Sequence, residues 1–173
     1  MLLPKVAIKK ILYATDLSQS ARYAYAYAVS LADHYCASIT LVHVLHDAPG
    51  FVENLIGADK YEEIKKRHYD DAREALIGKR REHLIVKEIL DKFCEDVRAD
   101  KSLPDIETDK ILISEGNPAE QILRAAEETD SDIIVIGTHG FGGIAEAMIG
   151  GTARQILRRS HKPVLAVRLP EDN

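Results

Sequence analysis

The stretch that decides the fold runs from residue 133 to residue 167 and begins with IIVIGTHGFGG at residues 133–143. Four consecutive β-branched apolar residues predict a strand that is buried on both faces, as in a parallel sheet. Glycines follow at once, where the chain must turn sharply and expose its backbone N–H groups. A helix that begins just after Gly151 would point its N–H groups and the positive end of its dipole at this loop. Anions, and phosphate above all, bind at such helix starts.

The glycines also have a simpler interpretation, because glycine after a strand often serves only a turn. Two phosphate-binding patterns are absent from the chain. The pattern G-x-x-x-x-G-K-[ST] needs a lysine that this loop lacks, and no glycine triplet keeps G-x-G-x-x-G spacing between a strand and a helix. The loop therefore predicts a site that is compatible with phosphate, without specifying which phosphate compound it binds.

Length and composition exclude several classes of protein. With 173 residues, the chain suits one domain, residues 1–173, with a sizeable core. Its net charge of -5 argues against a general nucleic-acid binder, which usually carries a basic surface. No apolar run reaches the roughly 20 residues of a membrane span, and the N-terminus lacks the apolar core of a signal peptide. Cys36 and Cys94 form no C-x-x-C pair, so we expect packing cysteines in a reduced, cytoplasmic protein.

Apolar strand patterns alternate with helical patterns along the chain. We expect strands at about 9–15, 38–45, 108–114, 133–136 and 163–169. Ser18 or Ser20 should cap the helix after the first strand, and Asn117 with Pro118 should start the helix after the third. This order predicts an α/β protein with a doubly wound, five-stranded parallel sheet and helices on both faces, as in Rossmann-like folds.

A long excursion, residues 47–104, separates the second and third expected strands. From about residue 59 to residue 97 its apolar positions mostly step by three or four, which predicts one long amphipathic helix, or two broken near Gly78. Basic clusters at residues 65–67 and 79–81 alternate with acidic residues. They therefore indicate a solvated helix face and not a nucleic-acid site.

Several aromatic residues in the first half have structural interpretations. Tyr23, Tyr25 and Tyr27 alternate along the first expected helix, which spreads them around its surface. We interpret them as packing and surface residues. His43 lies inside the second expected strand, where a hydrogen-bonded packing histidine is commoner than a ligand.

In a doubly wound sheet, ligands bind beyond the carboxyl ends of the strands, where the strand order reverses. Two loops should face each other there: the one with Thr15 and Asp16, and the one at residues 137–143. The Asp16 carboxylate could accept hydrogen bonds from a ribose hydroxyl or from an adenine amino group. It could equally serve only to stabilise the first turn of the following helix. The residues alone leave both interpretations open.

Motifs spread over nearly the whole chain resemble a known family. They are ILYATDLS at 11–18, LVHV at 41–44, GTHG at 137–140, GG at 150–151 and HKPVLAV at 161–167. Together they resemble the universal stress protein family. The spacing of Gly137, Gly140 and Gly150 also matches the glycine pattern of its nucleotide-binding branch.

The resemblance implies a function as well as a fold. It implies a homodimer, often paired through the last strand, here Val164, Leu165, Ala166 and Val167. In the nucleotide-binding branch, ATP or AMP lies across the ends of the first and fourth strands, with Mg²⁺ as a potential companion of the phosphates. The implied protein is a ligand-dependent regulator of a stress response, acting on a signalling partner that the sequence does not name.

The resemblance also implies a set of site residues. Asp16 would hold the adenosine end, with Ala14 and Thr15 beside it, and Val44 would line the adenine pocket. Gly137 and Gly140 would approach ribose and phosphate through their backbone, and Gly150 would admit the phosphates at the last helix. The complete implied set is Ala14, Thr15, Asp16, Val44, Ile136, Gly137, Thr138, His139, Gly140, Gly150, Gly151 and Thr152.

One residue departs from the family pattern. The nucleotide-binding branch usually carries Ser or Thr directly after its third motif glycine, whereas this chain has Gly151 there, and Thr152 follows. A lost hydroxyl removes a hydrogen bond worth about 1 kcal/mol, or roughly tenfold in affinity. We therefore expect weakened binding, or a shift toward nucleotides with fewer phosphates.

Three other functions compete with the nucleotide-binding regulator. Gly151 favours an interaction protein of the same fold without a nucleotide. A slow ATPase would need charge stabilisation near the loop, where His139, Arg154 and Arg158 are the obvious polar residues. We interpret His139 as a brace of the turn and expect no dedicated catalytic activity and no catalytic residue. A flavin carrier is the remotest of the three.

Overall fold

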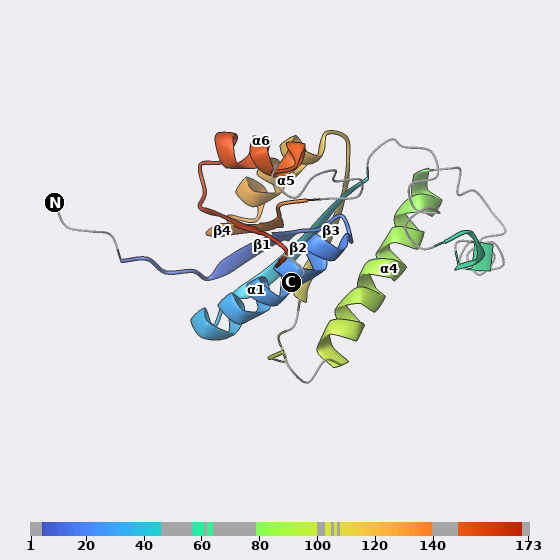
Figure 1. The fold of residues 1–173 in the computed structure, drawn as a ribbon, viewed down its shortest axis with the longest axis horizontal. Coiled ribbons are helices and arrows are strands. Elements are labelled where there is room, and N and C mark those ends of the chain that lie inside the picture. Colours follow the sequence, from blue (N-terminus) through green and yellow to red (C-terminus); the bar gives the residue numbers. More distant parts are fainter. Residues whose placement is uncertain are drawn as a thin grey trace.

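The computed structural model describes residues 5–45, 57–60, 62–63, 79–99, 103–104, 106, 108–139 and 149–170. At its centre lies a five-stranded parallel sheet in the order β3-β2-β1-β4-β5, with helices on both faces (Figure 1). The elements are β1 (Lys10–Ala14), α1 (Gln19–Tyr35), β2 (Ser38–Leu45), α4 (Lys79–Ala99), β3 (Thr108–Glu115), α5 (Pro118–Glu128), β4 (Ile133–Gly137), α6 (Gly151–Arg159) and β5 (Val164–Val167). The predicted doubly wound α/β fold is confirmed.

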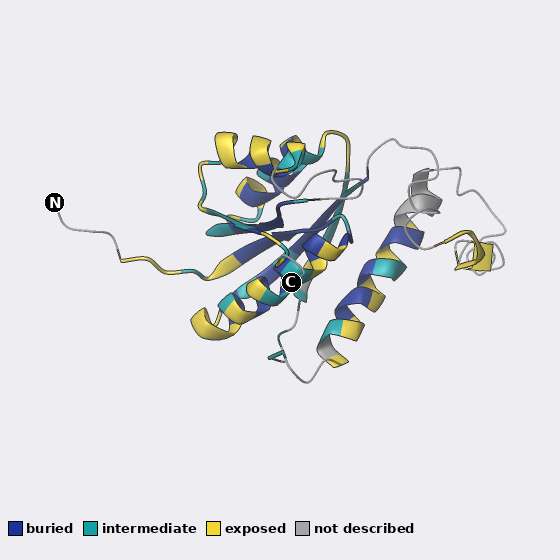
Figure 2. Ribbon diagram, in the orientation of Figure 1, coloured by how far each residue is buried: buried dark blue, intermediate teal, exposed yellow. Residues whose placement is uncertain are grey.

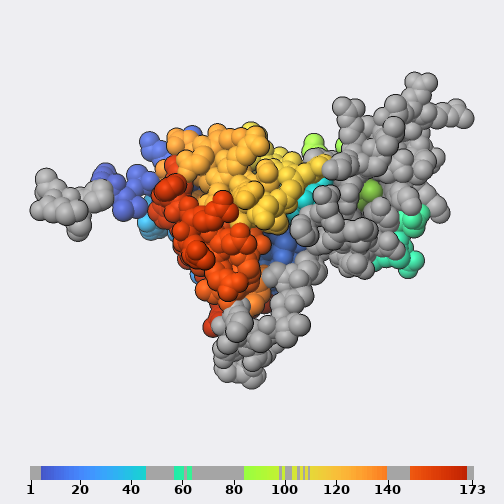
Figure 3. Space-filling model, turned by 90° about the horizontal axis from the view of Figure 1, so that it is seen from above, coloured from blue at the N-terminus to red at the C-terminus, as the bar shows by residue number. Residues whose placement is uncertain are grey.

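Side chains that alternate along each strand divide the core into two layers. Ile11 and Tyr13 of β1 belong to the layer under α1 and α4, whereas Leu12 and Ala14 belong to the layer under α5 and α6. Figure 1 shows these helix pairs on opposite sides of the sheet, and Figure 2 shows that the strands between them are mostly buried. Figure 3 looks onto the outer surface of α5 and α6, which lie side by side. Cover on both faces explains why the central strands are continuous apolar runs.

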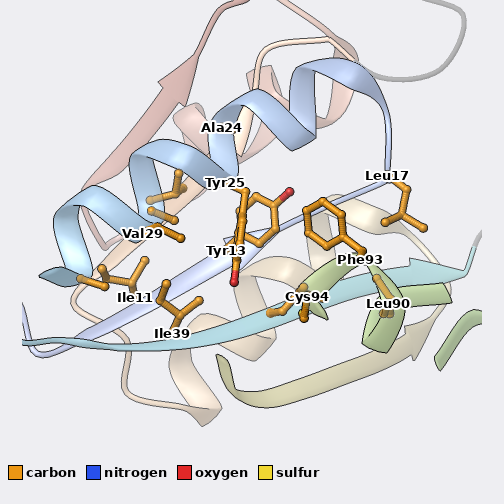
Figure 4. Packing of buried hydrophobic residues seen from close by; sticks show 14 of the residues in the cluster. Ile11, Tyr13, Leu17, Ala24, Tyr25, Val29, Ile39, Leu90, Phe93 and Cys94 are labelled. Carbon is orange, nitrogen blue, oxygen red and sulfur yellow. The ribbon is translucent and has the colours of Figure 1, made fainter. Parts of the chain in front are cut away.

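Three aromatic rings lie at the middle of the layer under α1 and α4. The ring of Tyr25 lies 4.7 Å from that of Tyr13 and 5.2 Å from that of Phe93, measured between centroids (Figure 4). The Tyr13 hydroxyl donates a hydrogen bond to the Ala21 carbonyl at 2.7 Å, and burial raises the pKa of Tyr13, so the phenol stays neutral. Aromatic pairs of this kind add about 0.5–1.5 kcal/mol beyond area burial. They fix α1 and α4 against β1 next to its carboxyl end.

The predicted helix starts are confirmed. The Ser18 hydroxyl caps α1 by accepting a hydrogen bond from the Ala21 N–H at 3.2 Å. The Asn117 side chain caps α5 by accepting from the Glu120 N–H at 3.1 Å, and Pro118 occupies the first helical position. The α1 cap matters for function, because it fixes the chain directly after Asp16.

Two expected elements differ in extent. β5 has four residues, fewer than predicted, because its partner β4 is itself short. In the excursion, α4 buries the expected apolar positions Val86, Leu90 and Phe93. Residues 58–60 and 62–63 are helical, whereas residues 64–78, with the expected break near Gly78, lie outside the described residues.

The two cysteines have different environments. Cys94 of α4 is buried, as expected, but Cys36 is exposed, so the packing role expected for Cys36 is wrong. It forms the C-cap of α1 with a left-handed φ of 51°, where the chain leaves the helix toward β2. Among the described residues, no helix is long and apolar enough to cross a membrane, and no group of three His, Cys, Asp or Glu side chains could hold a metal ion.

Candidate functional site

The strand order reverses between β1 and β4. From β1 the chain moves outward to β2 and β3, and it then returns to place β4 and β5 on the other side. Ala14 at the end of β1 pairs with Ile136 near the end of β4. The loops that follow these two strands therefore leave the same edge of the sheet in opposite directions, which is where doubly wound proteins bind ligands.

The two loops touch at this edge. The Ser18 hydroxyl donates to the His139 carbonyl, and the His139 N–H donates to the Ser20 hydroxyl, each over a long 3.4 Å. Ser18 is the N-cap of α1, Ser20 lies in its first turn, and His139 lies two residues after β4. The structure therefore brings the predicted Asp16 loop and the start of the predicted glycine loop together.

Asp16 is half-buried and lies two residues before Ser18, in the loop that makes these contacts. Its Oδ1 accepts a hydrogen bond from the Ser18 N–H at 3.0 Å, which stabilises the turn into α1. The next residue, Leu17, adopts a left-handed φ of 65°, which is uncommon for a residue with a side chain. Since an ionised carboxylate accepts about four hydrogen bonds, the Ser18 amide uses only part of its capacity. The helix-start role of Asp16 is thus observed, and it is compatible with ligand binding.

The other predicted residues at this edge are three apolar residues, here called the apolar wall, and a supporting threonine. Ala14, Val44 and Ile136 come near or at the carboxyl ends of their strands and share the core layer under α5 and α6. Thr15 is buried, and all its polar groups are engaged inside the protein. Its N–H donates to the Val42 carbonyl at 3.0 Å, and its hydroxyl accepts from the Leu17 N–H at 2.9 Å. Thr15 therefore supports the loop from below.

His43 supports the same loop, as a buried residue of β2. Its Nδ1 lies 2.8 Å from the Thr15 carbonyl, which can only accept, so Nδ1 carries the proton. Burial lowers the pKa of His43, against the smaller opposing effects of Thr15 and Asp16, and favours the neutral ring. The interpretation of His43 as a hydrogen-bonded packing residue is confirmed. Its contact with Thr15 was not predicted, because the sequence does not show which residue faces a strand histidine.

Thr138 and His139 hold the loop after β4. Thr138 is buried, its N–H donates to the Val167 carbonyl at 2.8 Å, and its carbonyl accepts from the Gly150 N–H at 2.7 Å. Its hydroxyl is hydrogen-bonded to His139 Nδ1 at 2.9 Å. His139 Nε2 is buried and finds no hydrogen-bond partner within the described residues. These contacts agree with the interpretation of His139 as a brace of the turn.

The predicted glycines have different surroundings. A Cβ atom on Gly137 would lie 2.7 Å from Ser20 Oγ, so α1 itself requires a glycine there. A Cβ atom on Gly150 would lie 3.1 Å from the Thr138 carbonyl oxygen. A Cβ atom on Gly151 would meet none of the described residues within 4 Å. Contacts within the fold thus explain Gly137 and Gly150, whereas Gly151 faces open space; Gly140 lies outside the described residues.

The start of α6 completes the site. Gly150 is its N-cap and makes no side-chain hydrogen bond to the helix. The Gly150 N–H is already bonded to Thr138, so the first-turn donors are the N–H groups of Gly151, Thr152 and Ala153. None of these three has an acceptor within the described residues. Their N–H groups and the helix dipole favour an anion at this position.

A sheet of this order, with two adjoining loops at its switch point, defines a class of ligand-binding α/β proteins. A model of the Universal stress protein family matches residues 7–168. The chain therefore belongs to the universal stress protein family, as its motifs predicted.

Sequence relatives and solved structures agree with this assignment. Universal stress protein MJ0577 of Methanocaldococcus jannaschii is 30% identical over 173 residues, which cover 94% of this chain and 96% of the relative. A universal stress protein of Thermus aquaticus is 30% identical over 161 residues, covering 92% and 98%. UspA from Lactobacillus plantarum has the same fold, with a TM-score of 0.65 at 20% identity over 95% of this chain and all of that one.

Two further structures of the fold were solved with ligands. One is a universal stress protein in complex with cAMP, with a TM-score of 0.56 at 21% identity, covering 94% of this chain and 98% of that one. The other, from Archaeoglobus fulgidus, is in complex with dAMP, with a TM-score of 0.57 at 20% identity, covering 92% and 97%.

Proposed function

We propose that this chain is a homodimeric stress-response module that binds an adenine nucleotide, ATP or AMP, at the edge between β1 and β4 and acts as a ligand-dependent regulator. The observation that carries the proposal is the contact between the Asp16 loop and the loop after β4. This contact joins the loop of the half-buried Asp16 carboxylate to the loop after β4. The Thr138 carbonyl of that second loop is in turn hydrogen-bonded to the Gly150 N–H at the start of α6. A nucleotide needs both features, one for its nucleoside and one for its phosphates.

In this proposal the site residues fall into three groups. Asp16 accepts hydrogen bonds from the ribose or from the adenine amino group. The N–H groups of Gly151 and Thr152 bind phosphate oxygens, with Mg²⁺ as a potential companion of ATP. The remaining residues shape the site: the wall of Ala14, Val44 and Ile136, and the loop supports Thr15, Gly137, Thr138, His139, Gly140 and Gly150.

The ligand class has independent support from related structures. Proteins of this fold were solved with cAMP and with dAMP, which share an adenine base and an α-phosphate. These proteins are only 21% and 20% identical to this chain, so they support the adenine nucleotide as a class and leave the number of phosphates to experiment.

Isothermal titration with ATP and AMP tests the proposal, using Asp16→Asn as the diagnostic variant. Asparagine keeps an oxygen for the Ser18 N–H but loses the charge, so the turn is retained. We expect nucleotide affinity to fall by about tenfold or more, since hydrogen bonds to charged groups contribute about 1.5–3 kcal/mol. Asp130→Asn is the matched control, because Asp130 is exposed and lies before β4, at the opposite end of the sheet. An absence of binding to wild-type protein at millimolar nucleotide would remove the proposal.

Gly151 favours a second candidate, an interaction protein of the same fold that has no nucleotide. The open space at Gly151 allows a direct test, because Gly151→Ser adds the family's hydroxyl without a clash. If the wild-type site binds nucleotide weakly, the serine should tighten ATP binding by up to about tenfold. Mass spectrometry of gently purified protein adds a second measurement. No copurified nucleotide, and no ATP binding even by Gly151→Ser, would favour the second candidate.

The proposed homodimer forms through β5. This strand is the last in the sheet and, among the described residues, pairs with β4 alone, which leaves its outer edge open there. Val164, Leu165 and Ala166 are half-buried in the single chain. An open strand edge with apolar side chains readily pairs with another strand, so a second copy can continue the sheet.

A further inference from the structure

The segment from the start of α6 to the end of β5 is basic, although the whole chain has a net charge of -5. Residues 149–170 contain no Asp or Glu, and their positive side chains are Arg154, Arg158, Arg159, Lys162 and Arg168. Two of these charges are partly balanced: Arg159 lies 3.8 Å from Glu120 of α5, and Lys162 lies 3.7 Å from Asp130. Arg154 and Arg158 are exposed and form no ion pair within the described residues. The exposed face of α6 therefore carries two positive charges that no described residue compensates.

Arg154 has a particular place on this face. It is the fourth residue of α6, and the side chains that α6 buries are those of Ala153 and Ile156, on the other side of the helix. Its Cα lies about 4.5 Å along the helix axis from that of Gly151. Helical side chains tilt back toward the N-terminus and cover the preceding turn. The Arg154 guanidinium can therefore extend over the turn whose N–H groups meet no acceptor, beside the open space at Gly151.

We propose that Arg154 binds the outer phosphate of a nucleoside di- or triphosphate at the start of α6, in place of the hydroxyl that Gly151 lacks. This inference rests on the proposed nucleotide function and extends it to the number of phosphates. A guanidinium forms two parallel hydrogen bonds to a phosphate and keeps its charge at every physiological pH. The backbone N–H groups suffice for the α-phosphate of AMP, whereas ATP gains the additional arginine contact. The site therefore selects ATP over AMP, contrary to the shift toward fewer phosphates that Gly151 alone predicts.

Arg158 provides a matched control on the same helix. It has the same side chain, is also exposed, and begins one turn farther from the helix start, about 6 Å along the axis. General attraction between a basic surface and a polyanion depends on both arginines alike. A specific phosphate contact depends on Arg154 alone.

The experiment is a calorimetric titration of wild type, Arg154→Gln and Arg158→Gln with ATP, AMP and adenosine, at low and at high salt. We expect Arg154→Gln to lose about tenfold or more in ATP affinity, with a much smaller change for AMP and none for adenosine. Arg158→Gln should bind all three compounds as wild type does. Arg154→Lys should recover only part of the ATP affinity, since an ammonium group lacks the bidentate geometry.

Other results would overturn the inference in distinguishable ways. Equal losses of ATP affinity in the two glutamine variants, which vanish at high salt, would indicate general electrostatic attraction. ATP binding that is unchanged in Arg154→Gln would remove the arginine contact while the nucleotide function stands. Wild-type protein that binds none of the three compounds would remove the nucleotide function and this inference together.

Discussion

At the scale of single residues, the glycines near the candidate site have different structural roles. Gly137 makes room for the first turn of α1, and Gly150 makes room for the Thr138 carbonyl. At Gly151, no described residue lies close enough to exclude a side chain. A glycine pattern that resembles a ligand cradle in the sequence therefore combines residues that the fold requires with one that it does not.

A pair of alanine substitutions separates these roles. In Gly137→Ala the new methyl group would lie 2.7 Å from Ser20 Oγ and 2.9 Å from the Ser20 carbonyl carbon, so α1 must shift. We expect a loss of about 1–3 kcal/mol in the free energy of unfolding, as for other overpacked sites. Gly151→Ala should be neutral or stabilising by up to about 1 kcal/mol, because alanine restricts the unfolded chain and favours the helix. Urea unfolding of the two variants measures the difference, and equal stabilities would contradict it.

His43 gives the protein a predictable response to acid. Burial holds its pKa below the ordinary value of 6.5, so the unfolded chain binds a proton more readily than the folded protein does. The contribution of His43 to stability is therefore complete above that pH and is lost as the pH falls below it, toward the folded-state pKa. Urea titrations at several pH values should show this decline, with a slope of at most about 1.4 kcal/mol per pH unit for one proton.

The control for this acid response is His43→Gln. Glutamine retains an N–H donor for the Thr15 carbonyl but does not titrate, so stability should fall overall and vary less with pH in this range. Asp132 also has a lowered pKa, because its carboxylate accepts hydrogen bonds from the N–H groups of Lys9 and Lys10. Its effect on stability falls in a separate pH range, below its ordinary pKa of 3.8. An unaltered pH dependence in the glutamine variant would assign the decline to other groups.

At the scale of elements, local signals predicted most of the fold. The β-branched runs predicted the strands, and Ser18 and Asn117 predicted the helix starts, because a cap and its partner lie within three residues. The contacts of the site join residues far apart in the chain, such as Ser18 with His139 and Thr15 with His43. Periodicity says nothing about such partners. Nor does it distinguish a glycine that admits a helix from one that admits a ligand, since both need only the missing side chain.

The edge of β5 carries a prediction about assembly. The Pro163 carbonyl accepts a hydrogen bond from the Ile134 N–H, and the Val167 carbonyl accepts one from the Thr138 N–H. The backbone groups of Val164 and Ala166 therefore point to the open edge. In Ala166→Pro, the outer N–H is lost while the bonds to β4 remain, and proline is tolerated on edge strands. We expect a folded monomer, detected by light scattering after size-exclusion chromatography and by circular dichroism. A variant that remains dimeric would place the interface elsewhere.

At the scale of the whole molecule, the candidate site spans both halves of the fold. Asp16 belongs to the half built from β1, β2 and β3, whereas Thr138 and Gly151 belong to the half built from β4 and β5. A ligand at this edge contacts both halves at once. Binding therefore raises the free energy of unfolding of the whole domain, because the unfolded chain offers no such site.

This linkage predicts thermal protection by nucleotide. At a free ATP concentration of 100 times the dissociation constant, binding adds about 2.7 kcal/mol, which raises the melting temperature by roughly 5–10 °C for a domain of this size. Differential scanning calorimetry measures the shift. Tripolyphosphate at the same concentration should give a much smaller shift, because it lacks the adenosine that we propose Asp16 recognises. Equal protection by the two compounds would contradict a site at Asp16.

The central place of β1 also has a consequence for biosynthesis. This strand leaves the ribosome first among the five, yet Ile11 pairs on one side with Ile133 of β4, near the far end of the chain. A nascent chain must keep that side of β1 uncovered until residues 133–137 have been translated. Distant pairings form slowly, and an uncovered apolar strand is prone to aggregation in the interval. Translation that halts before residue 133 therefore leaves an aggregation-prone fragment and not a smaller folded domain.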